Sequence, residues 1–184
     1  PNLTWPFRIQ TQGAIIVSAG VLNLQNSTAT GTVSGGVTVA TGAALELQGN
    51  LTVGAETLTI SGTGVGGSGA LRNISGDNSW GGTVRLAANS EIQSDGGTLT
   101  LGAANSVTNA TGTARNLAVD GAGNTTINGT ITTTTGTLTM NGIGTLTLLG
   151  TNTYTGASAV NQGIVTLGGA NGSSTGSAFN VSSG

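Results

Sequence analysis

The stretch LELQGNLTVGAETLTI, residues 45–60, contains three short phrases in which apolar residues alternate with polar ones. The phrases begin at Leu45, Leu51 and Leu58 and are separated by segments that contain glycine. Side chains of a β-strand point alternately to opposite faces, so both apolar members of a phrase point to one side and the middle residue to solvent. Each phrase therefore predicts a very short strand with one buried face.

The same phrase recurs along most of the chain, whereas a helical periodicity is nowhere sustained. The threonine-rich and glycine-rich composition also opposes helix. Phrases six or seven residues apart, as in residues 45–60, are too closely spaced for the hairpins of a sandwich. They suit the faces of a β-solenoid, in which each coil pairs in parallel with its neighbours. The phrases are Val37–Val39, Leu45–Leu47, Leu51–Val53, Leu58–Ile60, Val84–Leu86, Leu99–Leu101, Leu117–Val119, Leu138–Met140, Leu146–Leu148 and Val165–Leu167.

Three longer repeats predict the length of a coil. The pattern Val-x-x-Gly followed by two alternating apolar residues begins at residues 17, 39 and 160. Thr-Leu-Thr occurs at residues 57–59, 98–100 and 137–139, a spacing that we interpret as two coils. The block Gly76–Gly82 is matched by Gly150–Gly156. We expect a single all-β solenoid domain over residues 1–184, with roughly 20–24 residues per coil, roughly eight coils and a length on the order of 40 Å.

These blocks also carry a resemblance to a known family. Gly150-Thr-Asn-Thr-Tyr-Thr-Gly156, flanked by GTLTL at residues 144–148 and GIVTLGG at 163–169, resembles the autotransporter-associated β-strand repeat of large bacterial surface proteins. Residues 58–80 are similar to the same repeat, and the resemblance extends over residues 51–169. It implies a right-handed parallel β-helix located outside the cell or at the bacterial cell surface. Passenger stalks, adhesins and extracellular fibres belong to such families.

The composition excludes most kinds of chemistry. Lysine, histidine and cysteine are absent, and charged residues make up only 5% of the chain. Without an imidazole or a thiol there is no serine or cysteine protease arrangement and no usual zinc site. The four arginines, at positions 8, 72, 85 and 115, are too few and too scattered for nucleic acid. We expect no enzyme, cofactor, metal or nucleic-acid partner, and no membrane-spanning segment, because no long apolar run is present.

Two motifs resemble sites but lack essential parts. Asp77, Glu91 and Asp95 are the acids closest to a glycosidase-like pair, which also needs a sugar-binding cleft, and we interpret them as solvated surface charges. The run Gly66-Gly67-Ser68-Gly69 begins like a calcium-binding repeat, but Leu71 stands where an aspartate ligand is needed.

The ends of the chain hold aromatic residues that are rare elsewhere. Trp5, Pro6 and Phe7 lie near the start and Phe179 near the end. A solenoid exposes unpaired strand edges at its ends, which associate with other chains unless they are capped. We expect residues 1–13 to form an N-terminal cap or, alternatively, an end-to-end assembly segment, and residues 170–184 to form an open C-terminal end.

Asn78, Trp80, Asn152 and Tyr154 occupy matching positions of the two blocks and are candidate corner and stacking residues. Asparagines at equivalent corners can bond each other as a ladder, and Asn141 and Asn161 are weaker candidates. Asparagine also simply suits turns.

Three functions remain open at this point. The first is a non-enzymatic structural segment of a rigid stalk or fibre, which associates end to end or continues into neighbouring repeats of a longer chain. The alternative is an adhesin module that binds a glycan or host surface through its outward Thr, Asn and Ser side chains. Ice binding through Thr-x-Thr pairs is a more distant alternative, because the pairs look irregular in the sequence.

Overall fold

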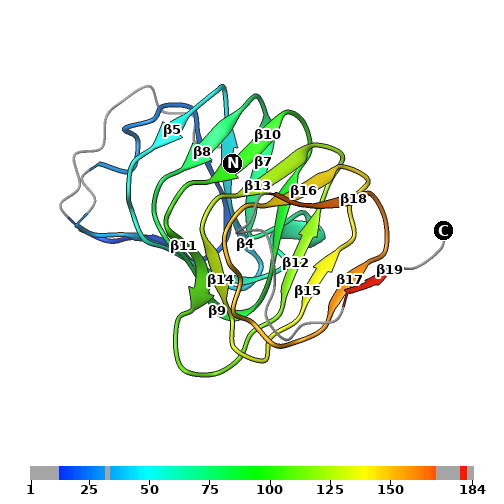
Figure 1. Ribbon diagram of the computed structural model, residues 1–184. Helices are drawn as coiled ribbons and strands as arrows, with labels where there is room; N and C mark the ends of the chain where they lie inside the picture. The colour runs from blue at the N-terminus through cyan, green and yellow to red at the C-terminus, as the bar shows by residue number, and fades with distance from the viewer. Residues whose placement is uncertain (1–12, 32–33, 169–178, 182–184) are drawn as a thin grey trace.

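The computed structural model describes residues 13–31, 34–168 and 179–181. In this part of the chain every pairing between strands is parallel, and successive coils stack into a β-solenoid of about seven turns (Figure 1). The parallel solenoid predicted from residues 45–60 is thus confirmed. The coil length varies more than expected, since a wider interval separates Ser79 from its partner Thr52 than separates Ser158 from its partner Leu138.

The strands of the solenoid lie on three faces. The first face contains β1 (Ile15–Val17), β3 (Val37–Val39), β6 (Leu58–Gly62), the start of β9 (Val84–Ser94), β11 (Asn105–Asn109) and β14 (Thr130–Thr132). The second face contains β2 (Gly20–Leu24), β4 (Ala43–Gln48), β7 (Leu71–Ser75), the end of β9, β12 (Leu117–Asp120), β15 (Leu138–Met140), β17 (Ser158–Val160) and β19 (Phe179–Val181). The third face contains β5 (Thr52–Val53), β8 (Asn78–Trp80), β10 (Thr98–Leu101), β13 (Asn124–Ile127), β16 (Thr145–Leu148) and β18 (Ile164–Leu167).

These faces form two hydrogen-bonded sheets. The first and second faces join into one sheet of 13 strands, because the long strand β9 pairs with β6 and β11 at its start and with β7 and β12 at its end. The third face is a separate sheet of six strands in the order β5-β8-β10-β13-β16-β18. Figure 1 shows these six strands side by side along the upper edge of the molecule.

The core is a column of aliphatic side chains enclosed by the three faces. Leu45, Leu71, Ile92, Val119 and Met140 pair in register on successive coils of the second face, and none is more than 1% exposed. Nine of the ten phrases predicted from the sequence lie within strands, and in the tenth Leu51 directly precedes β5. Short strands of this kind bury little surface alone, so stacking is what produces a continuous core.

Glycines with positive φ form the corners that the sequence pattern Val-x-x-Gly marks. Gly20, Gly42 and Gly163 have φ of 73°, 79° and 67°, a conformation that costs other residues more. Gly20 begins β2 and Gly42 directly precedes β4, so both mark the corner between the first and second faces, whereas Gly163 lies between the second face and β18 on the third. The third copy of the pattern therefore has the same backbone geometry as the first two, but it forms a different corner of the coil.

The Thr-Leu-Thr register predicted from the sequence is wrong. Thr59 lies in β6 on the first face, Thr100 in β10 on the third and Thr139 in β15 on the second. The intervals between these phrases are not multiples of one coil, because the coils differ in length along the stack. One of the longer coils contains the only helical turn described, a 3₁₀ turn at Val65–Gly67.

The predictions for the chain ends fall largely outside the described residues. Trp5, Pro6 and Phe7 lie there, as do most of residues 1–13 and 170–184. Phe179 begins β19, which continues the second face by pairing with β17. In the described part of the chain, no helix is long and apolar enough to cross a membrane.

Candidate functional site

The first corner block buries both of the residues that the sequence singled out. Asn78 Oδ1 accepts a hydrogen bond of 2.6 Å from the backbone N–H of Leu51 on the preceding coil. The Trp80 ring lies in the core with no exposure, and its Nε1 donates to the carbonyl of Glu56 at 2.8 Å. The side chains of Asn78 and Trp80 therefore connect this corner block to the backbone of the preceding coil through two hydrogen bonds.

The second corner block repeats this construction in another place. Asn152 Oδ1 accepts from the backbone N–H of Ile131 at 2.8 Å, and the Tyr154 hydroxyl lies 2.7 Å from Ser158 Oγ. Asn152 and Tyr154 are fully buried. Six residues after the asparagine, each block leads into a strand: Asn78 leads to Val84 on the first face, and Asn152 to Ser158 on the second.

The two blocks are therefore equivalent in local structure but do not stack on each other. Asn78 and Asn152 form no common ladder, whereas Asn161 Nδ2 donates to Asn141 Oδ1 at 2.8 Å, as stacking on equivalent corners requires. The burial of both rings also matters for function, because a ring must be exposed to stack against a sugar. Trp80 and Tyr154 are structural residues of the core.

A buried polar cluster that the sequence reasoning missed surrounds Asn78. Asn78 Nδ2 donates to Asn73 Oδ1, and Asn73 Nδ2 donates to Ser94 Oγ at 3.1 Å and to the Gly96 carbonyl at 2.9 Å. Asn73 and Ser94 occupy inward positions paired with each other in β7 and β9. A polar residue where the alternation requires an apolar one, as in Leu71-Arg72-Asn73, was the available signal.

The three acids considered for catalysis occupy different environments, and the expectation of a solvated surface charge is wrong for Glu91. Asp77 Oδ1 accepts from the backbone N–H of Thr98 at 2.9 Å, and Asp95 accepts from Arg72 Nε at 2.7 Å. Glu91 is buried in β9, where desolvation raises the pKa of its carboxyl group and repulsion from Asp120 raises it further. Among the described residues, no three His, Cys, Asp or Glu side chains are grouped so that they could hold a metal ion.

The second face carries an outward ladder of amide and charged side chains, which we call the amide–charge ladder. Several of its members bond to one another between neighbouring coils, whereas Asp120 lies in register with Gln93 and its carboxylate accepts from the N–H of Gly121. Asn23 donates to Glu46 at 3.1 Å, and Arg72 bridges Glu46 and Asp95. Gln93, which pairs with Arg72, also donates to Asp95. The members of the ladder are Asn23, Glu46, Arg72, Gln93, Asp95, Asp120, Asn141 and Asn161.

The third face carries a different outward row, which we call the hydroxyl column. Six residues in register on six successive coils each present a hydroxyl group, without interruption. None of these hydroxyls forms a hydrogen bond to another described residue, in contrast to the amide–charge ladder. The column consists of Thr52, Ser79, Thr100, Thr126, Thr147 and Thr166.

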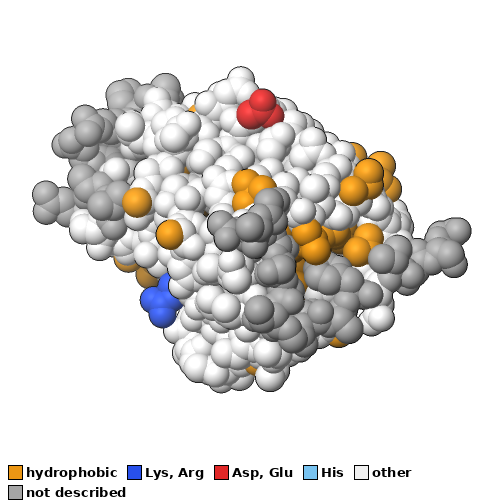
Figure 2. Space-filling model, in the orientation of Figure 1, with side chains coloured by type: hydrophobic (Ala, Val, Ile, Leu, Met, Phe, Trp, Pro, Cys, Tyr) orange, Lys and Arg blue, Asp and Glu red, His pale blue; other side chains and the backbone are white. Residues whose placement is uncertain are grey.

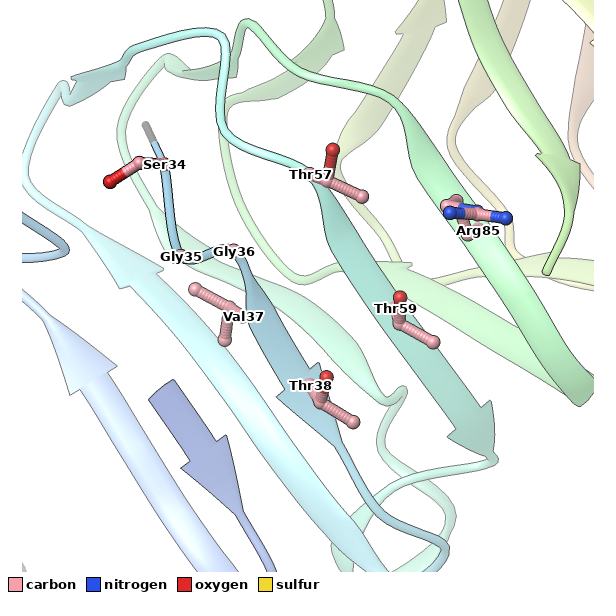
Figure 3. Close-up of a pocket in the computed structure, with 8 residues that line it drawn as sticks. All are labelled: Ser34, Gly35, Gly36, Val37, Thr38, Thr57, Thr59 and Arg85. Carbon is pink, nitrogen blue, oxygen red and sulfur yellow. The ribbon is translucent and has the colours of Figure 1, made fainter. Parts of the chain in front are cut away.

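A shallow hollow of about 240 Å³ lies on the first face, next to an exposed arginine. Figure 3 shows Thr38, Thr59 and Arg85 on adjacent strands around it, with Thr57 just before β6. Arg85 Nη2 donates to the Ala110 carbonyl at 2.9 Å, which leaves other N–H groups of this guanidinium for a ligand. Hydroxyls beside a guanidinium are suited to an anionic group such as a carboxylate.

The C-terminal end of the described stack exposes apolar side chains. Leu167 pairs in register with Leu148 on the preceding coil, yet Leu167 is 47% exposed and Leu148 is fully buried. Ile164 on the same strand is 60% exposed. Figure 2 shows a surface that is mostly uncharged, with apolar patches gathered toward this side. Among the described residues, strand β18 therefore presents inward-type apolar positions that are partly exposed.

No family model, no curated protein and no solved structure matches this chain.

Proposed function

We propose that the chain is a non-enzymatic structural segment of a rigid bacterial surface stalk or fibre. The observation that carries the proposal is the partly exposed apolar edge at β18, which presents the same inward positions that are buried in the strand before it, β16. Val165 and Leu167 occupy the positions of Leu146 and Leu148, which are fully buried. A further coil stacked on β18 would remove these side chains from water and pair the strand edge.

Parallel pairing along the whole stack supports a mechanical role. About seven coils at about 4.8 Å per coil give a rod of about 34 Å, cross-linked by backbone hydrogen bonds along its axis. The amide–charge ladder adds side-chain bonds in the same direction. Rods of this type extend by adding coils, because each coil contacts only its neighbours.

The extracellular or cell-surface location is part of the proposal and is supported by the resemblance of residues 51–169 to autotransporter repeats. In the isolated chain, the apolar edge at β18 has a second copy as its available partner, whereas in a longer protein it would receive the next repeat. End-to-end association of the isolated chain is therefore the measurable consequence.

The experiment is sedimentation velocity of the purified chain over a range of concentrations, with electron microscopy of the same samples. We expect concentration-dependent association of the wild type and a loss of it in a Val165→Lys/Leu167→Lys variant, because burying lysine at the contact is unfavourable. Ile143→Lys is the matched control, since Ile143 is 68% exposed and lies outside the strands. A wild type that stays monomeric at all concentrations contradicts the proposal.

The hollow beside Arg85 favours a second candidate function, an adhesin that binds an acidic glycan. Thr38, Thr57 and Thr59 would hydrogen-bond sugar hydroxyls and Arg85 the carboxylate. The test is saturable binding to a panel of neutral and uronic-acid oligosaccharides. Binding restricted to acidic members and lost in Arg85→Gln supports this function, and equal responses from both proteins contradict it.

A further inference from the structure

The hydroxyl column differs from one outward row on each of the other two faces, because its six members all present a hydroxyl group and none of these hydroxyls bonds to another described residue. On the first face the corresponding row reads Thr38, Thr59, Arg85, Thr108, Thr132, so an arginine interrupts it. On the second face the amide–charge ladder bonds internally. The hydroxyl column has six members in register and no hydrogen bond to another described residue, so its hydroxyls face the solvent with their full capacity.

The positions of these hydroxyls are fixed by the structure around them. Each inner strand of the third face is paired on both sides, and threonine has few χ1 rotamers. The neighbouring row is held as well, because Asn50 Oδ1 accepts from the N–H of Asp77, and Asn124 Oδ1 accepts from the N–H of Thr145. The column is thus a rigid row with a repeat of about 4.8 Å, set by the strand spacing.

The surface beside the column carries few bulky or charged side chains: among the positions two residues before and after each member, Asp77 is the charged one, and Leu149 and Ile164 are large exposed apolar ones. Two residues after each column member, the outward positions of four coils are glycines: Gly54, Gly81, Gly102 and Gly168. The column itself carries no charge, and each threonine in it presents one methyl and one hydroxyl group. A partner that matches the column is neutral, regularly spaced and able both to donate and to accept hydrogen bonds.

We propose that the third face binds ice, with the hydroxyl column holding a row of water molecules that continues the crystal lattice. The strand spacing is close to the distance between equivalent water oxygens in ice, and the third face repeats it in unbroken register over six coils. A glycan chain is the competing ligand, but sugar-binding faces commonly use exposed aromatic rings, and both described aromatic side chains with assigned exposure, Trp80 and Tyr154, are buried. This inference is independent of the structural function proposed above.

The sequence pattern alone does not indicate an ice-binding face. The Thr-Leu-Thr phrases are irregular along the chain, and three of them lie on three different faces. The row becomes visible only through the register, because Ser79 belongs to the corner block and Thr126 and Thr166 lie in strands that lack the full Thr-Leu-Thr phrase.

The test measures thermal hysteresis and the shape of single ice crystals in solutions of the wild type and of two variants. Thr100→Tyr/Thr126→Tyr places bulky rings in the middle of the column and should abolish ice shaping and hysteresis. Thr139→Tyr is the matched control, because Thr139 is an outward residue of β15 flanked by Ala118 and Ala159, and it should retain the wild-type values. Tyrosine is well tolerated in strands, and circular dichroism verifies folding.

Should the double tyrosine variant fail to fold, Thr100→Lys/Thr126→Lys serves the same purpose with flexible side chains. A folded wild type that neither shapes ice nor produces hysteresis overturns the inference, as does an equal loss in the column variant and in Thr139→Tyr. A parallel pull-down with cellulose and chitin particles identifies the competing ligand: binding there that depends on Thr100 and Thr126, without an effect on ice, also overturns it.

Discussion

The second and third faces of this solenoid show two ways of building an outward row on the same scaffold. In the amide–charge ladder, Arg72 bonds to Glu46 and Asp95 on the coils before and after it. In the hydroxyl column, Thr100 lies between Ser79 and Thr126 at the same spacing but bonds to neither. Long side chains in a row can reach one another and form hydrogen bonds between neighbouring coils. Hydroxyl groups that repeat at the strand spacing of about 4.8 Å are too far apart to hydrogen-bond each other directly.

The difference assigns different roles to the two faces. A self-bonded ladder stabilises the stack and offers few free groups to a partner. A row without internal bonds contributes little to the stack and leaves its donors and acceptors to solvent or ligand. Substitutions can test whether the ladder stabilises the protein and the column does not. The first substitution is in the core that both faces share.

The largest effect should come from Trp80, which lies inward beside the column residue Ser79. Trp80→Ala leaves a cavity in the core and frees the Glu56 carbonyl, and it should lower the free energy of unfolding by about 3–5 kcal/mol. Urea unfolding followed by circular dichroism measures it. Trp80→Phe keeps most of the packing and loses the N–H donor, so its effect should be about 1 kcal/mol. Equal effects of the two variants would show that packing of the indole is unimportant.

The next effect should come from breaking the ladder. Arg72→Ala removes the partner of Glu46 and of Asp95, and we expect a loss of about 1–3 kcal/mol in the free energy of unfolding. Added salt should shrink the difference from the wild type, since these side chains are partly exposed. Arg85→Ala is the control and should change stability by less than about 0.5 kcal/mol. A loss from Arg85→Ala as large as that from Arg72→Ala would contradict the special role of the ladder.

Strands and corners could be predicted from the sequence, but their places on the three faces could not. The alternation that marks Leu45, Leu51 and Leu58 depends only on local geometry, and it identified the strands correctly. The pattern around Gly163 and the block around Asn152 likewise mark real corners. A corner unit has the same local structure wherever the solenoid bends, so its sequence does not say which bend it forms.

The hydroxyl column could not be predicted from the sequence for the same reason. The face of a residue depends on the summed lengths of the coils before it, and these lengths vary from one coil to the next. Thr59 and Thr100 belong to identical phrases, yet only Thr100 belongs to the hydroxyl column. Buried polar residues such as Asn73 violate the alternation and were therefore missed as core positions.

A pH-dependent effect should come from Glu91, which is buried in β9 beside the ladder strand β12. Its pKa in the folded protein is raised above the ordinary 4.5, by desolvation first and by Asp120 second. The folded state therefore binds its proton more tightly than the unfolded chain, and stability falls as the pH rises from about 4.5 through the raised pKa. Glu91→Gln removes this loss.

The measurement compares urea unfolding of the wild type and Glu91→Gln at several pH values. The variant should gain stability over the wild type as the pH rises from 4 to 7, because the other carboxylates contribute equally to both proteins and cancel. Asp120→Asn should reduce the pH dependence only in part, since desolvation is the larger cause. A difference that does not change with pH would show that Glu91 ionises as freely in the folded protein as in the unfolded chain.

The smallest effect should come from the hydroxyl column itself. Thr100→Val/Thr126→Val keeps the shape and the β-branching of both side chains but removes two hydroxyls that bond to no described residue. The free energy of unfolding should change by less than about 0.5 kcal/mol per substitution, and the high strand propensity of valine favours a slight gain. A loss of more than about 1 kcal/mol per substitution would mean that these hydroxyls bond within the protein, and the contrast between the two faces would disappear. Stability without the hydroxyls, together with a change in what the third face binds, is the result that separates a binding surface from a structural one.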